Sequence, residues 1–329
     1  ENRALVRWGL SILPRTPNPG LRALLATTGL ADKGPISAGQ VGYVLAPRIN
    51  AVGRMSEALR GVELLLTDDH EEARRIAAEL EQENRYRREV DGRTLKEALA
   101  MLERDFDPSR DRGVVLASEG WHPGVIGIVA SRVVEEIHRP TVLVALDGGE
   151  GKGSGRSVRG FHLYEALSAC SKHLVRFGGH RMAAGCSIES WRLDAFRAAF
   201  DAEARARLAP EQLVPEVRVD LEVSLRELDG GFFRLLEHAA PFGVGNPTPV
   251  FAARGVQLAG APRVVGDRHL RMTMAEPGAR PEAIGFGMAD RLSEVSGRNQ
   301  PLDVAFKLDE NRWNGRTTLQ AKLVDIRPA

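Results

Sequence analysis

Basic and small residues are concentrated in one segment of this chain, which reads KGSGRSVRGFHLYEALSACSKHLVRFGGHR from Lys152 to Arg181. The segment holds six Lys or Arg and three His residues against one carboxylate, whereas the whole chain has a net charge of only +1. Glycine lets a backbone approach a ligand closely, and arginine can donate two hydrogen bonds to one phosphate. The segment therefore predicts a phosphate-binding site.

Two motifs within it supply the candidate ligands. GSGRS follows the apolar run TVLVAL, which we predict to be a strand, and RFGGHR follows a predicted helix. The candidate phosphate-binding residues are Ser154, Arg156, Ser157, Gly178, Gly179 and His180. Two other interpretations remain open: GSGRS as a flexible glycine hairpin, and GGH as a glycine helix stop with a surface histidine. Neither motif has the Walker or the dinucleotide-binding spacing.

Two further segments contribute candidates. In GWHPGVIGIVASR, His122 and Pro123 directly precede a predicted helix, whose N-terminus favours anions. In PRINAVGR, Arg54 is either a phosphate ligand or a solvated surface charge, and the sequence does not decide between them. Ligands of α/β domains collect where strands and helices end, so we expect the three motifs of the α/β region to converge.

Other reactive residue types have ordinary structural explanations. Asp68, Asp69 and His70 invite a metal-site interpretation, but they precede a predicted helix, where aspartate caps free backbone N–H groups. Cys170 and Cys186 do not have CxxC spacing, and we interpret them as small buried apolar residues. The sequence predicts no metal ligand and no catalytic residue.

Hydrophobic periodicity divides the chain into four predicted parts, giving an α/β plus all-β fold. Residues 1–67 are irregularly helical, and residues 68–105 form one long helix. Residues 106–210 alternate strand and helix, which predicts an α/β domain with a parallel sheet. Residues 211–329 contain short alternating strands, which predict a five-stranded OB-fold barrel.

The predicted barrel carries cations and aromatic residues that could bind unpaired bases. Its candidate DNA-binding residues are Arg268, Arg271 and Trp313, and Arg263, His269, Phe286 and Phe306 are nearby in the sequence. Aromatic side chains stack on bases and cations bind the backbone. Because about half of such aromatic residues belong to a core, Trp313 in the turn NRWNGR is the strongest stacking candidate.

Composition excludes several classes of protein. A chain with 43% hydrophobic residues can bury cores, and its nearly neutral charge argues against a general polyanion binder. It has no apolar run of about twenty residues and no signal-peptide pattern at its start. We therefore expect a cytoplasmic protein without a membrane partner.

The ordered motifs ENRALVRWGL, PRINAVGR, WHPGVIGIVASR, GKGSGRS, RFGGHRMAAGCSI and PFGVGNPTPVF resemble the RecJ family of bacterial single-stranded-DNA-specific exonucleases, in the DHH superfamily of phosphoesterases. The resemblance covers essentially the whole chain. It implies that residues 1–67 are the C-terminal part of a DHH domain, that 106–210 are a DHHA1 domain and that 211–329 are an OB-fold. It also implies 5′→3′ degradation of single-stranded DNA in repair and recombination, with Mn²⁺ or Mg²⁺.

The chain departs from the family pattern in one respect. The aspartate-rich motifs, including Asp-His-His, are expected before Glu1, and Asp68-Asp69-His70 lies on the wrong side of PRINAVGR to replace them. We therefore expect the isolated chain to be inactive. The resemblance places Arg54, Ser154, Arg156 and His180 near the 5′ end of DNA. It implies single-stranded DNA, a single-strand-binding protein and a repair helicase as partners of a monomer.

Two alternative functions remain. The first is a DHH-type oligoribonuclease or cyclic-dinucleotide phosphodiesterase, which shares the GGH motif, although very short substrates need no barrel. The second is a non-catalytic module that binds single-stranded DNA.

Overall fold

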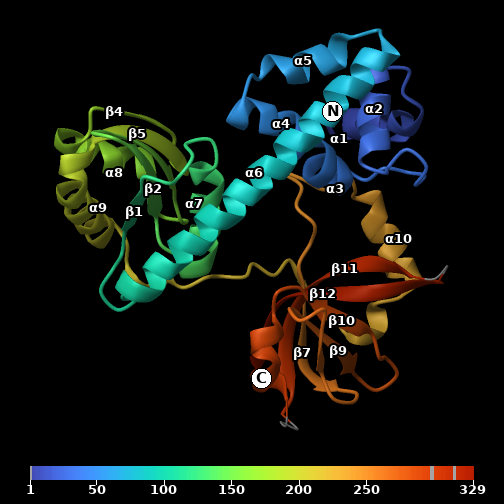
Figure 1. Ribbon diagram of the computed structural model, residues 1–329. Coiled ribbons are helices and arrows are strands. Elements are labelled where there is room, and N and C mark those ends of the chain that lie inside the picture. The colour runs from blue at the N-terminus through green and yellow to red at the C-terminus, as the bar shows by residue number, and fades with distance from the viewer. Residues whose placement is uncertain (1, 297–299, 314–315) are drawn as a thin grey trace. The chain divides into compact units, whose positions relative to one another are not determined.

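The computed structural model describes residues 2–296, 300–313 and 316–329, with side chains described outside 312–317. The chain forms two compact units (Figure 1). One unit is Ser11–Pro215, and the other combines Glu1–Leu10 with Glu216–Ala329. None of the helices in the described parts has a stretch long and hydrophobic enough to cross a lipid bilayer.

The first part of the chain is helical, as predicted. Its helices are α1 (Asn2–Ile12), α2 (Pro19–Thr27), α3 (Ala38–Gln40), α4 (Ala46–Met55) and α5 (Leu59–Leu66). Helices α2, α4 and α5 pack against the first half of α6 (His70–Asp105). Leu24, Leu64, Ile76 and Leu80 are fully buried between them. Burial of these large side chains is the main stabilising contribution to the contact.

Helix α6 is a single helix of 36 residues, and Gly92 does not interrupt it. It begins at a capping residue, because Oδ1 of Asp69 accepts the backbone N–H groups of Glu71 at 2.7 Å and Glu72 at 3.3 Å. This confirms the helix-cap interpretation of that aspartate. The second half of α6, including Ala98 and Leu102, packs in the core of the α/β domain. The long helix thus belongs to two hydrophobic cores.

The α/β domain is built on a five-stranded sheet with the order β1-β2-β3-β5-β4. Its strands are β1 (Val114–Ser118), β2 (Thr141–Asp147), β3 (Glu150–Arg156), β4 (Arg176–Gly179) and β5 (Ala183–Glu189). Only β1 and β2 pair in parallel, and the remaining pairs are antiparallel. The predicted parallel sheet is therefore wrong for three of the five strands, because hairpin turns connect β2 to β3 and β4 to β5.

Helices cover the two faces of this sheet differently. Helices α6 and α7 (Ile126–Ile137) share a core with β1 and β2, whereas α8 (Leu163–Ala169) and α9 (Leu193–Arg207) pack on the opposite face (Figure 1). The first of these faces is apolar only over β1 and β2. Beyond α7, the same face of β3, β5 and β4 carries polar and glycine residues.

Two glycine motifs, for which a hairpin and a helix stop remained open interpretations, are strands. GSGRS contains the end of β3, and RFGG is β4 rather than the end of a helix. The glycines of β3 face the core, where a Cβ at Gly153 would lie only 2.4 Å from Sγ of Cys186, and one at Gly155 3.1 Å from Leu163. Close packing against the sheet therefore explains glycines that, in the sequence, are typical of a loop.

The second unit contains a closed barrel. Its strands are β6 (Leu221–Glu222), β7 (Phe251–Leu258), β8 (Arg263–Val265), β9 (His269–Ala275), β10 (Glu282–Gly285), β11 (Leu302–Trp313) and β12 (Arg316–Pro328), with helices α10 (Gly230–His238) and α11 (Leu292–Val295). The sheet order is β6-β7-β11-β12-β10-β9-β8, and an additional pairing between β7 and β9 closes the ring. Phe251, Leu270, Met274 and Phe306 fill its core. The predicted barrel is confirmed.

Candidate nucleic-acid interface

A groove lies on the open face of β3, β5 and β4. Side chains alternate along a strand, so Lys152, Ser154 and Arg156 point to the face opposite the packed glycines of β3. The register places Ser187 and then Arg176 beside Lys152. The groove is lined by Pro123, Ile126, Lys152, Gly153, Ser154, Arg176, Phe177, Gly178, Gly185, Cys186 and Ser187. Strands β3, β5 and β4 therefore form its floor, and the start of α7 forms a wall.

The groove carries positive charge without a counter-charge. Its lining includes Lys152 and Arg176 and no carboxylate. Nε of Arg176 donates to Oγ of Ser187 at 3.1 Å, which orients the guanidinium over β5. Such a surface favours an anionic ligand, and planar guanidinium groups match phosphate oxygens in particular.

Arg156 lies at one end of this face. Its Nη1 donates to Oγ of Ser154 at 3.3 Å and to the carbonyl oxygen of Gly155 at 2.8 Å. Burial lowers the pKa of Arg156, and the nearby charge of Arg54 lowers it further. Arginine nevertheless remains protonated at neutral pH. Among the described residues, no carboxylate lies within ion-pair distance of either arginine. The two guanidinium groups therefore lie near each other without a carboxylate partner in the described residues.

The structure places Arg54 beside the other phosphate candidates. Arg54 is in the last turn of α4, and its Nη1 donates to the carbonyl oxygen of Gly124 at 3.3 Å. A Cβ at position 124 would lie 2.1 Å from the carbonyl oxygen of Arg54, so the close approach of α4 requires glycine there. The sequence did not decide whether Arg54 lies near the other candidates. The contact between α4 and the loop at Gly124 places Arg54 near them.

The start of α7 is placed as predicted. His122 is half-buried, and its Nδ1 accepts the backbone N–H of Gly124 at 3.0 Å. This bond holds the loop that carries Pro123 to the groove wall. Gly127, in the first turn of α7, lies against Ser154 and Arg156. His122 therefore supports the loop, and its ring nitrogen Nδ1 already has a partner.

The GGH motif lies at the hairpin between β4 and β5. Gly178 lines the groove, and Gly179 has a φ of +142° and lies where a Cβ would be 2.5 Å from Cα of Ala184. The exposed His180 donates its backbone N–H to the carbonyl oxygen of Ala183 at 2.8 Å. Ala183 is also the register partner of Arg156. His180 and Arg156 thus share one end of the sheet.

Ser157 does not belong to this face. It is buried, and its hydroxyl donates to the carbonyl oxygen of Phe161 at 2.9 Å. Strand β3 ends at Arg156, and the following chain turns into the core. The prediction that Ser157 binds phosphate is therefore corrected. Sequence reasoning did not select Lys152, Arg176, Gly185 and Ser187, because the alternation that places them on one face appears only once these segments are recognised as strands.

The candidate residues of the barrel differ in their exposure and partners. Arg271 is engaged by Glu282, with Nη2 at 2.7 Å and 2.8 Å from the two carboxylate oxygens. Arg268 is exposed in the turn before β9, and Phe306 is fully buried. The side chain of Trp313 lies outside the described residues. Phe286 is 56% exposed, and the ring of His269, at the start of β9, contacts it edge-on, so Phe286 is an exposed aromatic residue of the barrel.

Comparison with known proteins identifies the two domains. Residues 111–206 match the DHHA1 domain, and residues 219–325 match the RecJ OB domain. The chain is 38% identical over 340 residues to the single-stranded-DNA-specific exonuclease RecJ of Dickeya dadantii, covering 100% of this chain and 58% of that protein. The RecJ of Bacillus subtilis is 33% identical over 329 residues, covering 99% of this chain and 41% of that protein.

The chain carries the DHHA1 and RecJ OB domains and is similar to RecJ proteins along its whole length. The crystal structure of RecJ in complex with Mn²⁺ from Thermus thermophilus matches with a TM-score of 0.83 and 34% sequence identity, over 100% of this chain and 47% of that chain. This chain therefore spans about half the length of the RecJ relatives it matches.

RecJ from Thermus thermophilus has been solved with Mn²⁺ and with Mg²⁺. In the described residues of the present chain, no three or more His, Cys, Asp or Glu side chains are grouped so that they could hold a metal. Asp69 belongs to the Asp68-Asp69-His70 run that invited a metal-site interpretation, and it caps α6 instead. The described part of the chain thus does not fit a metal site.

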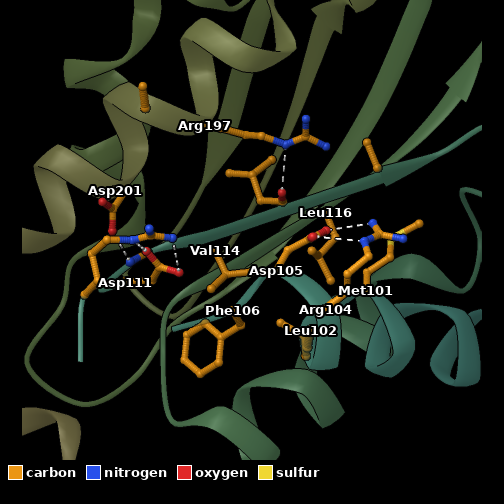
Figure 2. Close-up of a pocket in the computed structure, with 15 residues that line it drawn as sticks. Met101, Leu102, Arg104, Asp105, Phe106, Asp111, Val114, Leu116, Arg197 and Asp201 are labelled. Atoms are coloured by element: carbon orange, nitrogen blue, oxygen red, sulfur yellow. Dashed lines mark hydrogen bonds and ion pairs between the residues drawn. The ribbon is translucent and has the colours of Figure 1, made fainter. Parts of the chain in front are cut away.

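A second pocket lies at the free edge of β1, away from the candidate groove (Figure 2). Asp201 of α9 accepts the backbone N–H groups of Arg112 at 2.8 Å and Gly113 at 3.1 Å through Oδ1. Nε of Arg197 donates to the carbonyl oxygen of Val115 at 3.1 Å. These side chains occupy backbone groups that an edge strand would otherwise offer to another strand. We therefore assign the pocket a structural role.

Proposed function

We propose that this chain binds the 5′ end of single-stranded DNA for a RecJ-type exonuclease that degrades DNA in the 5′→3′ direction during repair and recombination. The observation that carries the proposal is the pair of cations, Arg54 and Arg156, beside Ser154 and without a carboxylate partner in the described residues. A terminal phosphate supplies the missing negative charge and accepts hydrogen bonds from both guanidinium groups.

The chemistry that this chain contributes is binding and charge stabilisation. Arg156 and Ser154 would hold the phosphate from β3, and Arg54 would reach it from α4. Exposed His180, at the same end of the sheet, would contact the terminal nucleotide. Mn²⁺ or Mg²⁺ held elsewhere in the enzyme would supply activated water for hydrolysis. Cations placed at the phosphate stabilise the negative charge that develops as a phosphodiester is cleaved.

The barrel would offer a binding surface of its own for single-stranded DNA. Exposed Phe286 can stack on an unpaired base, and exposed Arg268, in the turn before β9, can contact the DNA backbone. We include Trp313 as a further stacking candidate and assign no DNA contact to Arg271, whose guanidinium is paired with Glu282. A barrel that binds several nucleotides favours a long single strand over a dinucleotide as the substrate.

We also infer the setting in which the chain works. A single-strand-binding protein and a repair helicase would deliver single-stranded DNA, and the chain would act as a monomer in the cytoplasm. These inferences follow from the proposed substrate, because single strands in cells arise by unwinding and are covered by binding proteins.

The test compares Arg156→Ala with the unchanged chain. Affinity for a 5′-phosphorylated oligothymidine of about twelve nucleotides is measured by fluorescence anisotropy, because site sizes of OB-folds are of this order. Loss of a charge-assisted contact should weaken binding by about 1.5–3 kcal/mol, and a 5′-hydroxyl oligomer should show a smaller change. Arg104→Ala removes an equal charge from the exposed Arg104–Asp105 pair and is the control.

Equal affinity of Arg156→Ala and the unchanged chain for the 5′-phosphorylated oligomer would rule out Arg156 as the phosphate ligand. The second arm adds Mn²⁺ to the 329-residue chain and follows oligomer degradation. We expect binding with little hydrolysis, because the described residues hold no metal cluster. Stronger binding of a dinucleotide than of the long oligomer would favour the oligoribonuclease or cyclic-dinucleotide alternative.

A further inference from the structure

The floor of the groove contains two glycines that the fold does not require. Gly178 and Gly185 are opposite each other in the pairing of β4 and β5. A Cβ at Gly178 would meet no atom within 4 Å, and one at Gly185 would lie 3.5 Å from the carbonyl oxygen of Gly153, an ordinary contact. Neither residue has a positive φ. Alanine would therefore fit at both positions.

Neighbouring glycines differ in this respect. Gly153 has no room for a Cβ, which would lie 2.4 Å from Sγ of Cys186, and Gly179 has a positive φ. Packing and backbone geometry thus explain those two residues. Glycine within a strand is unfavourable by roughly 0.5–1 kcal/mol relative to alanine. Two unforced glycines side by side on an exposed floor are consistent with a ligand that lies directly on the backbone.

Charged side chains flank this glycine floor on both sides. Ser154 is the register partner of Gly185, so the row Ser154, Gly185 and Gly178 crosses three strands. The adjacent row is Lys152, Ser187 and Arg176, and Arg156 lies on the other side of the floor. Lys152 and Arg156 are four residues apart on β3, a separation of about 13 Å at about 3.3 Å per residue. The floor therefore lies between two separate cationic positions.

The cationic surface of the groove ends at a row of carboxylates. Glu150 and Glu189 are register partners two residues beyond Lys152 and Ser187, so they follow on the same face. Nε of Arg192 pairs with Glu189 at 2.8 Å. Glu150 has no ion-pair partner among the described residues and repels a negatively charged strand, so the favourable surface extends only from Arg156 to Lys152. The length of the surface corresponds to a few nucleotides.

We propose that Gly178 and Gly185 form the floor of a second nucleotide subsite, in which Lys152 and Arg176 bind an internal phosphodiester of single-stranded DNA. The base or sugar of that part of the strand lies against the bare backbone of β4 and β5, and exposed Pro123 forms the apolar wall. This proposal rests on the proposed function, because it assumes that Arg156 binds the terminal phosphate.

The first test adds a methyl group to the floor. Gly185→Ala and Gly178→Ala should keep the thermal unfolding midpoint of the chain, since neither new Cβ meets a clash. Both should weaken binding of a 5′-phosphorylated oligothymidine of about twelve nucleotides by about fivefold or more. Gly92→Ala, at an exposed position of α6 where a Cβ also meets nothing within 4 Å, is the matched control and should bind normally.

The second test removes the cations. Lys152→Gln and Arg176→Gln together should weaken binding and reduce the slope of log K against log salt by about 0.7 for each phosphate that is no longer neutralised. With a 5′-phosphorylated mononucleotide, this double variant should show neither the weaker binding nor the smaller salt slope. A mononucleotide bound at Arg156 cannot reach the row that holds Lys152 and Arg176. The effect of Arg156→Ala should persist with that short ligand.

The outcomes separate this inference from the proposed function. If the floor and cation variants bind the long oligomer normally while Arg156→Ala weakens it, the second subsite is wrong and the terminal phosphate site stands. If the floor and cation variants weaken binding while Arg156→Ala does not, the groove binds DNA but not through a terminal phosphate at Arg156. Normal binding by all variants overturns both.

Discussion

A Cβ at Gly127 would lie 3.0 Å from Nη2 of Arg156, so the first turn of α7 has room for this guanidinium because residue 127 is glycine. The same Cβ would lie 2.8 Å from Oγ of Ser154. Both contacts involve the ends of polar side chains, which can rotate away. A larger residue would therefore displace the proposed phosphate ligands before it disturbed the core.

Gly127→Ala should separate binding from stability. Alanine favours the helix by about 0.5–1 kcal/mol, so the free energy of unfolding should stay the same or rise. Displacement of Arg156 should weaken binding of 5′-phosphorylated DNA by about 1 kcal/mol, a factor of about five. Urea unfolding and anisotropy titrations on the same samples measure the two quantities. A variant that binds normally would show that the guanidinium can act from another position.

Arg139 should be a major determinant of stability in the α/β domain. It is 7% exposed and donates to the backbone carbonyl oxygens of Pro108, Asp111, Ile137, His138 and Leu213. Arg139→Met fills similar space but leaves these carbonyl groups without their donor. We expect a loss of about 2–4 kcal/mol, measured by urea unfolding.

Arg104→Met provides the control for Arg139. The Arg104 side chain is 70% exposed and, among the described residues, forms an ion pair with Asp105 alone (Figure 2). The loss in unfolding free energy should be below about 1 kcal/mol, as for other exposed ion pairs. Equal losses for the two variants would contradict a special role for the buried carbonyl contacts.

Cys170 and Cys186 should make stability fall at alkaline pH. Burial raises the pKa of the Cys170 thiol to about 11 and that of the Cys186 thiol to about 12, from 9.0. The folded state therefore holds these protons more tightly than the unfolded state. The contribution of the two protonated thiols to the free energy of unfolding is complete below about pH 9. It is lost as the pH rises through 11 and 12.

Two measurements check the state of the thiols. The urea midpoint should decline above about pH 9 less steeply in the double variant Cys170→Ala, Cys186→Ala. At about pH 8, a thiol reagent should label the native chain slowly and the urea-unfolded chain fast, because only the thiolate reacts. Rapid native labelling would contradict the buried, protonated thiols.

Sequence patterns predicted the elements that have strong periodicity. The helical spacing of Ile76, Ala77 and Leu80 predicted α6, and the structure confirms it, with the cap at Asp69. The alternating residues of His269–Ala275 predicted a barrel strand, because one face of each strand packs inward. Glycine-rich segments do not show an alternation of polar and apolar side chains. The sequences of β3 and β4 therefore resembled turns rather than strands.

The sequence by itself determined which residues could bind phosphate and in which parts of the chain they lie, since residue type and local periodicity are properties of short segments. Only the tertiary structure decided which of them meet. It brought Arg54 of α4 to Arg156 of β3, turned Ser157 into the core and aligned Lys152 with Arg176. The physical reason is that strand register and helix packing depend on contacts between residues far apart in the chain, and no local pattern records them.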